Sequence, residues 1–226
     1  MVSERAAIFD VDGVLVDSYR PHLESWRRVA AERGLEITEE QFAATFGRTS
    51  REIIAAFWGR DLDDEERRRI DERKEELYRS IVRADFPAME GAADLVRALH
   101  AAGFRLAVAS SGPPENVALS IEGLGCAELF EVVVTGRDVV RGKPAPEVFE
   151  RAAAGLGVPA RRCVVVEDAP AGVAAARAAG MAVVALLGTA TPEDLRGADL
   201  VVRSLRELGP ERLAELIDRG GTGAET

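Results

Sequence analysis

From residue 91 onward, short apolar runs alternate with longer amphipathic stretches. The apolar runs are continuous, as is typical of parallel strands that are buried on both faces. The amphipathic stretches have helical spacing and end in glycine, which favours the end of a helix. The predicted strands lie at 104–110, 131–136, 162–168, 181–188 and 198–202, and the predicted helices at 91–103, 114–125, 146–157 and 171–180.

This alternation predicts an α/β fold with a Rossmann-like parallel sheet, which the apolar run at 6–10 is expected to join. The segment between about residues 20 and 85 contains only helical patterns. We therefore predict a helical cap domain at 19–85 that interrupts an α/β core domain made of 1–18 and 86–226. Within the cap, the charged stretch from Asp63 to Arg79 mixes both signs, so we interpret it as the solvated face of a helix.

Composition narrows the possible partners. A formal net charge of −10 over 226 residues gives no general attraction for nucleic acid or for an anionic membrane. An anionic ligand must therefore meet a locally positive pocket. The apolar run at 181–188 is too short to cross a bilayer, and the first residues do not resemble a signal peptide. Cys126 and Cys163 lack metal-type spacing, so we expect two free thiols in a cytoplasmic protein. The sequence leaves a monomer and a dimer open.

Two carboxylates follow the first predicted strand, in the stretch IFDVDGVLVDS. Asp10 ends the strand at the edge where open α/β sheets bind ligands. A carboxylate there can attack phosphorus, and a second one at Asp12 can protonate the leaving oxygen and then deprotonate water. The chain must bend for both to reach one substrate, and Gly13 makes such a bend easier. By itself, Asp12-Gly13 is equally typical of a simple turn.

Phosphoryl transfer also needs a cation and hydrogen-bond donors around the phosphate, and later strand ends offer both. Ser110, Ser111 and Gly112 precede a predicted helix and form a candidate anion site, although this tripeptide alone is a common turn. Lys143 stands between Gly142 and a proline, which hold it in position better than an ordinary loop lysine. The surrounding stretch RGKPAP lacks the glycine spacing of a Walker loop.

A candidate metal site lies at the end of another strand. Glu167 and Asp168 are adjacent carboxylates that repel each other unless a cation is near, and Mg²⁺ prefers such oxygen ligands. The alternative is that they only cap the helix predicted from Ala171. The ends of four predicted strands therefore each carry a group that phosphoryl transfer requires. One shared site explains this better than four unrelated local features do.

These motifs resemble those of the haloacid dehalogenase superfamily. The resemblance is carried by the stretch DVDGVLVDS from Asp10, by Ser110, by Lys143-Pro144 and by the stretch VVVEDAPAGVAAARAAGM at 164–181. The helical insertion resembles the cap of the branch that contains β-phosphoglucomutase, phosphoglycolate phosphatase and related sugar-phosphate phosphatases.

The resemblance implies roles for the motif residues. Asp10 would be the nucleophile and Asp12 the general acid and base, while Ser110 and Lys143 would hold the phosphoryl group. Mg²⁺ would be held by Asp10, the Asp12 carbonyl, Asp168 and, directly or through water, Glu167. Lys143 and the metal are expected to lower the pKa of Asp10.

Branches of the family differ in their acid and base groups. Dehalogenases lack an acid/base aspartate at the place of Asp12, because a departing halide needs no proton, so its presence favours phosphoryl transfer. Phosphonate-cleaving members use a cap lysine as a Schiff base. Lys74 is the only lysine of the cap here, and its surroundings do not resemble theirs.

Candidate substrate residues of the cap also follow from the resemblance. His22 matches a histidine that the mutase branch links to its acid/base aspartate, and Arg51 matches a phosphate-binding arginine. Arg48 is a second candidate, and Lys74 with Tyr78 resembles another pair near the substrate. The alternative for each is a solvated surface or hinge residue.

We therefore expect a Mg²⁺-dependent phosphatase of small phosphorylated metabolites, such as sugar phosphates or phosphoglycolate. The second hypothesis is a β-phosphoglucomutase that interconverts β-glucose 1-phosphate and glucose 6-phosphate, against which the apolar turn Gly112-Pro113-Pro114 counts weakly. A non-catalytic binding protein on the same scaffold is the third, since a fold does not dictate a function. Such a protein is expected to have lost a motif residue, and none is missing here.

Overall fold

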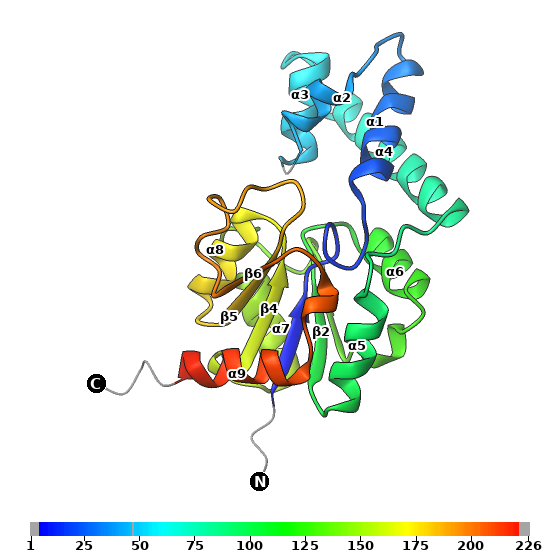
Figure 1. Ribbon diagram of the computed structural model, residues 1–226. Coiled ribbons are helices and arrows are strands. Elements are labelled where there is room, and N and C mark those ends of the chain that lie inside the picture. The colour runs from blue at the N-terminus through cyan, green and yellow to red at the C-terminus, as the bar shows by residue number, and fades with distance from the viewer. Residues whose placement is uncertain (1–4, 47, 222–226) are drawn as a thin grey trace. The chain divides into compact units, whose positions relative to one another are not determined.

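The computed structural model describes residues 5–46 and 48–221 (Figure 1). The chain divides into two compact units, which are described separately below. One, the α/β unit, contains the chain up to Asp17 and again from Ala88. The other, the helical unit, runs from Ser18 to Pro87.

The α/β unit is built on a parallel sheet, which has six strands in the described residues. Every neighbouring pair is parallel, and the order across the sheet is β3-β2-β1-β4-β5-β6. The predicted Rossmann-like α/β fold is confirmed. The strands are β1 (Ala6–Phe9), β2 (Arg105–Ala109), β3 (Val132–Val134), β4 (Cys163–Glu167), β5 (Ala182–Leu186) and β6 (Leu200–Val202).

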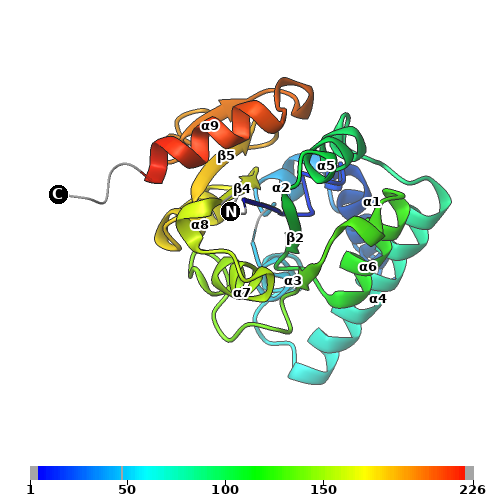
Figure 2. The same ribbon diagram turned by 90° about the horizontal axis from the view of Figure 1, so that it is seen from below.

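Helices cover both faces of this sheet, which explains why the strands are continuously apolar. Figure 2 shows α7 on one side and α5 with α9 on the other. Alternate strand residues such as Ile8 and Val165 pack in one cluster with Phe149 of α7 and Val173 of α8. The helices are α5 (Ala92–Ala101), α6 (Pro114–Gly123), α7 (Glu147–Leu156), α8 (Pro170–Ala178) and α9 (Pro210–Gly221), with 3₁₀ turns at Ala127–Leu129, Ala160–Arg162 and Leu205–Glu207.

The last helix, α9, is absent from the sequence-based prediction. Its pattern is present in the sequence: Pro210 occupies the first helical position, and Leu213, Leu216 and Ile217 follow at helical spacing, with Leu213 and Ile217 buried. The helix packs against β4 and β5, and its Asp218 accepts hydrogen bonds from Arg5 and Arg162.

The helical unit has no strand among its described residues. Its helices are α1 (Tyr19–Ala31), α2 (Glu39–Ala43), α3 (Ser50–Trp58) and α4 (Asp64–Ala84). Thr38 and Thr49 begin α2 and α3 with capping boxes, and Asp63 caps α4. A separate apolar core, which includes Trp26 and Ile54, holds the four helices together.

Helix α4 carries the charged stretch, and most of its ionic side chains are exposed as expected. Arg68 bridges Glu65 and Glu72 on this surface. A buried stripe runs along the other side at a spacing of four, through Ile70, Lys74, Tyr78 and Val82. A lysine inside such a stripe needs polar partners, which are described below. None of the described helices is long and apolar enough to cross a membrane.

Candidate active site

The loop after β1 turns sharply, and Gly13 makes the turn possible. The Asp10 N–H still continues the sheet by donating to the Val166 carbonyl at 3.0 Å, and the chain then folds back so that the Gly13 N–H donates to the Val16 carbonyl at 2.8 Å. Gly13 has φ +74°, and a Cβ atom at this position would collide with the carboxylate of Asp168. The glycine therefore provides both the bend and the room for a neighbouring carboxylate.

Lys143 joins three strand ends. It lies in the loop between β3 and α7, and its Nζ donates to Asp10 Oδ1 at 2.6 Å and to Glu167 Oε1 at 2.6 Å. A longer contact of 3.3 Å reaches the carbonyl of Ala109, at the end of β2. The side chains of Lys143, Asp10 and Glu167 are 9%, 10% and 1% exposed. The predicted nucleophile and the predicted cation are thus in direct contact.

Both carboxylate oxygens of Glu167 accept hydrogen bonds from the protein. While Oε1 accepts from Lys143, Oε2 accepts the backbone N–H groups of Asp168 at 2.8 Å and Ala169 at 2.9 Å. Gly172 leaves the room for this carboxylate, because a Cβ atom there would overlap it. These two N–H groups precede α8, which begins at Pro170 without a side-chain cap, so Glu167 fixes the turn before the helix and also orients the lysine.

The strand ends bring three buried carboxylates together. Asp10, Glu167 and Asp168 can each offer an oxygen, and these oxygens lie within 4.8 Å of one another. One ammonium faces three carboxylates, so the cluster has an excess of negative charge. Oxygen donors in this arrangement fit a hard divalent cation.

The pKa values of the cluster point the same way. Burial raises the pKa of Asp10 to about 7, and the charges of Glu167 and Asp12 add to the rise, whereas Lys143 lowers it. Burial and the charge of Glu167 likewise raise the pKa of Asp168. Lys143 therefore lowers the pKa of Asp10 as expected, but burial outweighs its effect, and the expected contribution of the metal stays a prediction. A further positive charge would keep these carboxylates ionised near neutral pH.

The predicted anion turn lies at the same edge of the sheet. The Ser110 N–H donates to the Val134 carbonyl, and its buried Oγ accepts the Gly112 N–H at 3.0 Å. A Cβ atom at Gly112 would lie 3.3 Å from Ser110 Oγ and 3.8 Å from Asp12 Oδ2, so the turn and the predicted acid/base are neighbours. Ser111 is exposed, and α6 begins three residues later.

In the helical unit, three of the predicted residues form one cluster. Lys74 Nζ lies 3.0 Å from His22 Nδ1 and donates to Glu75 Oε1 at 2.7 Å. The His22 ring stacks on Tyr78 with centroids 4.2 Å apart, and Nζ lies 5.4 Å from the centroids of the Tyr78 and Trp26 rings. This cluster supplies the polar partners that a buried lysine requires.

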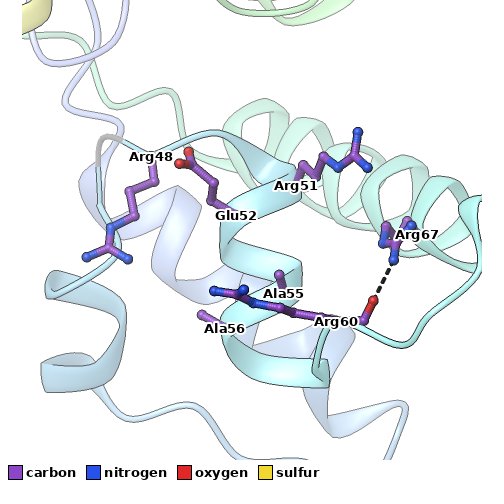
Figure 3. Close-up of a pocket in the computed structure, with 7 residues that line it drawn as sticks. All are labelled: Arg48, Arg51, Glu52, Ala55, Ala56, Arg60 and Arg67. Carbon is purple, nitrogen blue, oxygen red and sulfur yellow. Dashed lines mark hydrogen bonds between the residues drawn. The ribbon is translucent and has the colours of Figure 1, made fainter.

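Arg48 and Arg51 lie elsewhere in the helical unit, at a cavity of about 480 Å³ (Figure 3). The sequence-based search missed two further arginines of this cavity, Arg60 and Arg67. No local pattern distinguishes them from the many solvated arginines nearby. Among the described residues, those that line the cavity are Arg48, Arg51, Glu52, Ala55, Ala56, Arg60 and Arg67.

Comparisons with known proteins agree with one another. Residues 4–180 match the family model of the haloacid dehalogenase-like hydrolases. Validoxylamine A 7'-phosphate phosphatase of Streptomyces hygroscopicus subsp. limoneus is 32% identical, and the alignment covers 90% of this chain and 95% of the relative. Beta-phosphoglucomutase of Bacillus subtilis (strain 168) is 30% identical, and the alignment covers 93% of this chain and 94% of that relative. The crystal structure of a HAD hydrolase of family IA, variant 3, from Entamoeba histolytica superimposes with a TM-score of 0.87 at 27% identity, covering 95% of this chain and 99% of that one.

Proposed function

The chain belongs to the haloacid dehalogenase-like hydrolases, and on this premise we propose that it is a Mg²⁺-dependent phosphatase of small phosphorylated metabolites, such as sugar phosphates or phosphoglycolate. The observation that carries the proposal is the contact of Lys143 with both Asp10 and Glu167 beside the Asp168 carboxylate. A buried carboxylate fixed next to a cation and a candidate metal site is suited to attack on a phosphate.

The proposed reaction has two steps. Asp10 attacks phosphorus, the bond to the leaving oxygen breaks, and Asp12 donates a proton to that oxygen. Asp12 then removes a proton from water, whose oxygen attacks phosphorus; the bond between phosphorus and Asp10 breaks, inorganic phosphate is released, and the Asp10 carboxylate is restored. In both steps Lys143 and the Ser110 turn hold the phosphoryl oxygens, together with Ser111 and Gly112.

The residues at the strand edge fit the metal that this chemistry uses. Mg²⁺ would be held by Asp10, the Asp12 carbonyl and Asp168, and it would neutralise charge on the phosphoryl oxygens. For Glu167 we propose a role through water, because both of its oxygens already accept hydrogen bonds from the protein. Its main task would be to orient Lys143 toward Asp10.

We assign substrate selection to the helical unit, which corresponds to the cap predicted at 19–85. Arg51 and Arg48 would bind an anionic group of the substrate, and the cluster of His22 with Lys74 would bind its polar part. Two buried free thiols, Cys126 and Cys163, support a cytoplasmic location. We propose that the protein acts there as a monomer or dimer, without nucleic acid or membrane partners.

A β-phosphoglucomutase is the second candidate. It is favoured by His22, which matches the histidine that the mutase branch links to its acid/base aspartate, and by the 30% identity to the beta-phosphoglucomutase of Bacillus subtilis. The two functions differ in the group that attacks the aspartyl-phosphate, which is water in a phosphatase and a second sugar hydroxyl in a mutase.

Hydrolysis of p-nitrophenyl phosphate with Mg²⁺ tests the proposal, with Asp10→Asn as the variant that lacks the nucleophile. We expect phosphate release by the wild type and loss of release in Asp10→Asn. No turnover of this compound or of any sugar phosphate in a panel would refute the phosphatase. Conversion of β-glucose 1-phosphate that depends on added glucose 1,6-bisphosphate would replace it with the mutase.

A further inference from the structure

The loop between β3 and α7 carries Lys143, and its first residues also contact the turn at Ser110. At the end of β3, the Val134 carbonyl accepts the Ser110 N–H at 3.0 Å. Two residues later, the Gly136 N–H donates to the Gly112 carbonyl at 3.0 Å. One loop therefore meets both groups that hold the phosphoryl oxygens in the proposed reaction, the lysine and the turn.

Gly136 lies so close to this turn that no side chain fits there. A Cβ atom at Gly136 would overlap the Ser111 carbonyl oxygen and would lie 3.3 Å from the Gly112 carbonyl oxygen. Both are main-chain atoms, which cannot rotate away as the tip of a long side chain can. Gly136 does not have the positive φ of Gly13, so its missing side chain serves a close approach rather than a sharp bend.

The contact with Gly136 sets the orientation of one peptide group. The Ser111 carbonyl and the Gly112 N–H belong to the same planar peptide, so the position of one fixes the direction of the other. That N–H donates to the buried Ser110 Oγ at 3.0 Å. A hydroxyl oxygen that accepts this bond can still donate its own proton to a phosphoryl oxygen. The direction in which Ser110 donates thus depends on where Gly136 lies.

The segment around Gly136 is itself held in place. Asp138 Oδ2 accepts both the N–H and the hydroxyl of Thr135 at 2.7 Å, and the Asp138 N–H donates to the Thr135 carbonyl at 3.0 Å. Arg137 pairs with Glu115 of α6 at 2.9 Å, although an exposed pair of this kind contributes little. The bonds of Asp138 therefore make a closed turn that presents Gly136 to the Ser110 turn.

We propose that Gly136 is a positioning residue of the phosphoryl site, which holds the peptide between Ser111 and Gly112 so that the Ser110 hydroxyl faces the transferring group. Gly136 touches no substrate and acts only through the turn. The proposal rests on the proposed phosphatase function, and it adds that the loop after β3 sets the position of Ser110 as well as that of Lys143.

Kinetics of the full-length Gly136→Ala protein test this role. The added Cβ atom should displace the turn, and a misplacement of about 1 Å can cost about a hundredfold in rate, so kcat/KM for p-nitrophenyl phosphate should fall at least about tenfold. The inhibition constant of orthovanadate, which can adopt the five-coordinate geometry of a transferring phosphoryl group, should rise by a similar factor.

The matched control is Gly209→Ala, before α9. Gly209 also lacks a positive φ, and a Cβ atom there would meet only the end of the Glu211 side chain, at 3.7 Å. This variant should leave kcat/KM and the inhibition constant unchanged. Urea unfolding at the assay temperature checks that each variant is folded. Equal kcat/KM in Gly136→Ala and Gly209→Ala, in a protein whose wild type is active, overturns the proposal.

A double-mutant cycle tests whether Gly136 acts through Ser110. In the Ser110→Ala protein the hydroxyl is gone, so adding Gly136→Ala should lower kcat/KM by less than about threefold. If Gly136→Ala caused the same loss with and without the hydroxyl, the effect would not pass through Ser110, and the proposal would be wrong.

Hydrogen exchange of the Gly112 amide, followed by NMR without substrate or Mg²⁺, tests the position of the turn independently of activity. Gly136→Ala should raise the exchange rate at least about tenfold, because the bond of this N–H to Ser110 is weakened. An unchanged rate overturns the proposal. If the wild type releases no phosphate, only the phosphatase is refuted, and this exchange rate still decides whether Gly136 positions the turn.

Asp138→Ala is a second variant, which places no new atom near the turn. It removes the bonds that close the segment around Gly136, so kcat/KM should fall about threefold and Gly112 exchange should become faster. If Gly136→Ala does not fold, Asp138→Ala decides alone, and unchanged exchange of the Gly112 amide in that variant overturns the proposal.

Discussion

Two groups of charged side chains, one in each unit, are organised in opposite ways. At the strand edge of the α/β unit, the ammonium of Lys143 is buried and lies 2.6 Å from the carboxylates of both Asp10 and Glu167. At the cavity of the helical unit, Arg51 and Arg60 are exposed and form no ion pair with a described residue. The first group is fixed by contacts within the protein, whereas the second is not held by ion pairs among the described residues.

The difference follows from the elements that carry the two groups. Strand ends in a parallel sheet are held in register, so Asp10 continues the pairing of β1 with β4 and cannot move without breaking it. Long side chains that are exposed at the surface, whether on a helix or beside one, rotate freely and adapt to different ligands. Bond-breaking chemistry benefits from the fixed arrangement, and recognition of varied metabolites from the adaptable one.

Lys143→Met should have the largest effect, because it removes the only cation in contact with the buried carboxylates among the described residues. We expect kcat for p-nitrophenyl phosphate to fall about 10³-fold. Without Mg²⁺ the variant should also lose about 3 kcal/mol of unfolding free energy, since buried carboxylates remain without their partner. Steady-state kinetics and urea unfolding measure the two losses.

The matched control for this change is Arg141→Met, which removes an equal charge from an exposed position two residues earlier. It should leave kcat and stability close to those of the wild type. If Lys143→Met keeps kcat within about threefold of the wild type, the lysine does not act on the phosphate. The proposal that the fixed charges of the α/β unit carry the chemistry would then be wrong.

Gly13→Ala should have the next largest effect. Its Cβ atom would collide with the Asp168 carboxylate, and its φ of +74° is unfavourable for alanine. We expect weaker Mg²⁺ activation, with about a hundredfold loss of activity at limiting metal, because a displaced ligand or partner weakens metal binding by about that factor. Activity measured against Mg²⁺ concentration gives the result.

Gly180→Ala separates the two causes. Gly180 has a similar φ of +73°, but a Cβ atom there would meet nothing within 4 Å. Both variants should lose about 1 kcal/mol of stability from the backbone, and only Gly13→Ala should change the Mg²⁺ dependence. If both variants depended on Mg²⁺ in the same way, the proposal that Gly13 leaves room for the Asp168 carboxylate at the metal site would be wrong.

Lys74→Met tests the helical unit, where a smaller and more selective effect is expected. The methionine keeps the apolar stem but removes the contacts with His22 and Glu75. KM for sugar phosphates should rise about tenfold, while kcat for p-nitrophenyl phosphate should stay within about threefold. Arg69→Met, exposed on the same helix, should change neither. A parallel loss of kcat on both substrates would place Lys74 in the chemistry instead.

The sequence predicted the α/β unit well, because both the fold and the strand-end residues follow from local patterns. Continuous apolar runs mark the buried strands, and parallel strands bring Asp10, Ser110, Lys143 and Glu167 to one edge by topology alone. The sequence did not reveal that Lys143 is shared between two carboxylates, or that burial raises the pKa of Asp10. Those features depend on distances across the sheet that no local pattern records.

Prediction was poorer where the relevant residues are ordinary surface residues. Arg60 and Arg67 belong to a stretch that is rich in arginine, and only the packing of α3 against α4 separates the cavity from the solvated face. Helix α9 is a different case, because Leu213, Leu216 and Ile217 follow one another at helical spacing and the sequence therefore does carry its pattern. The roles of the site residues remain predictions that the variants above test.

Glu147 is expected to give the smallest effect, because it acts on the Lys143 loop from outside the buried site. It lies in the first turn of α7, where its carboxylate accepts the N–H groups of Val140 at 3.1 Å and Arg141 at 3.0 Å and pairs with Arg151. These contacts lower the pKa of Glu147 to about 2, with the two backbone N–H groups contributing most. Glu147→Gln should loosen the loop and lower kcat about threefold.

The pH dependence of stability gives a sharper test of the same contact. A carboxyl group whose pKa is lowered on folding stabilises the protein above its unfolded pKa of about 4.5, and this stabilisation is lost as pH falls toward 2. The stability difference between the wild type and Glu147→Gln should therefore be constant from pH 7 to pH 5 and should shrink below about pH 4.5. Urea unfolding at pH 7, 5 and 3.5 measures it. If the stability difference between the two proteins did not change with pH, Glu147 would hold the loop by its shape rather than by its charge. The contact of Glu147 at the surface would then differ in kind from the electrostatic contacts of the buried Lys143.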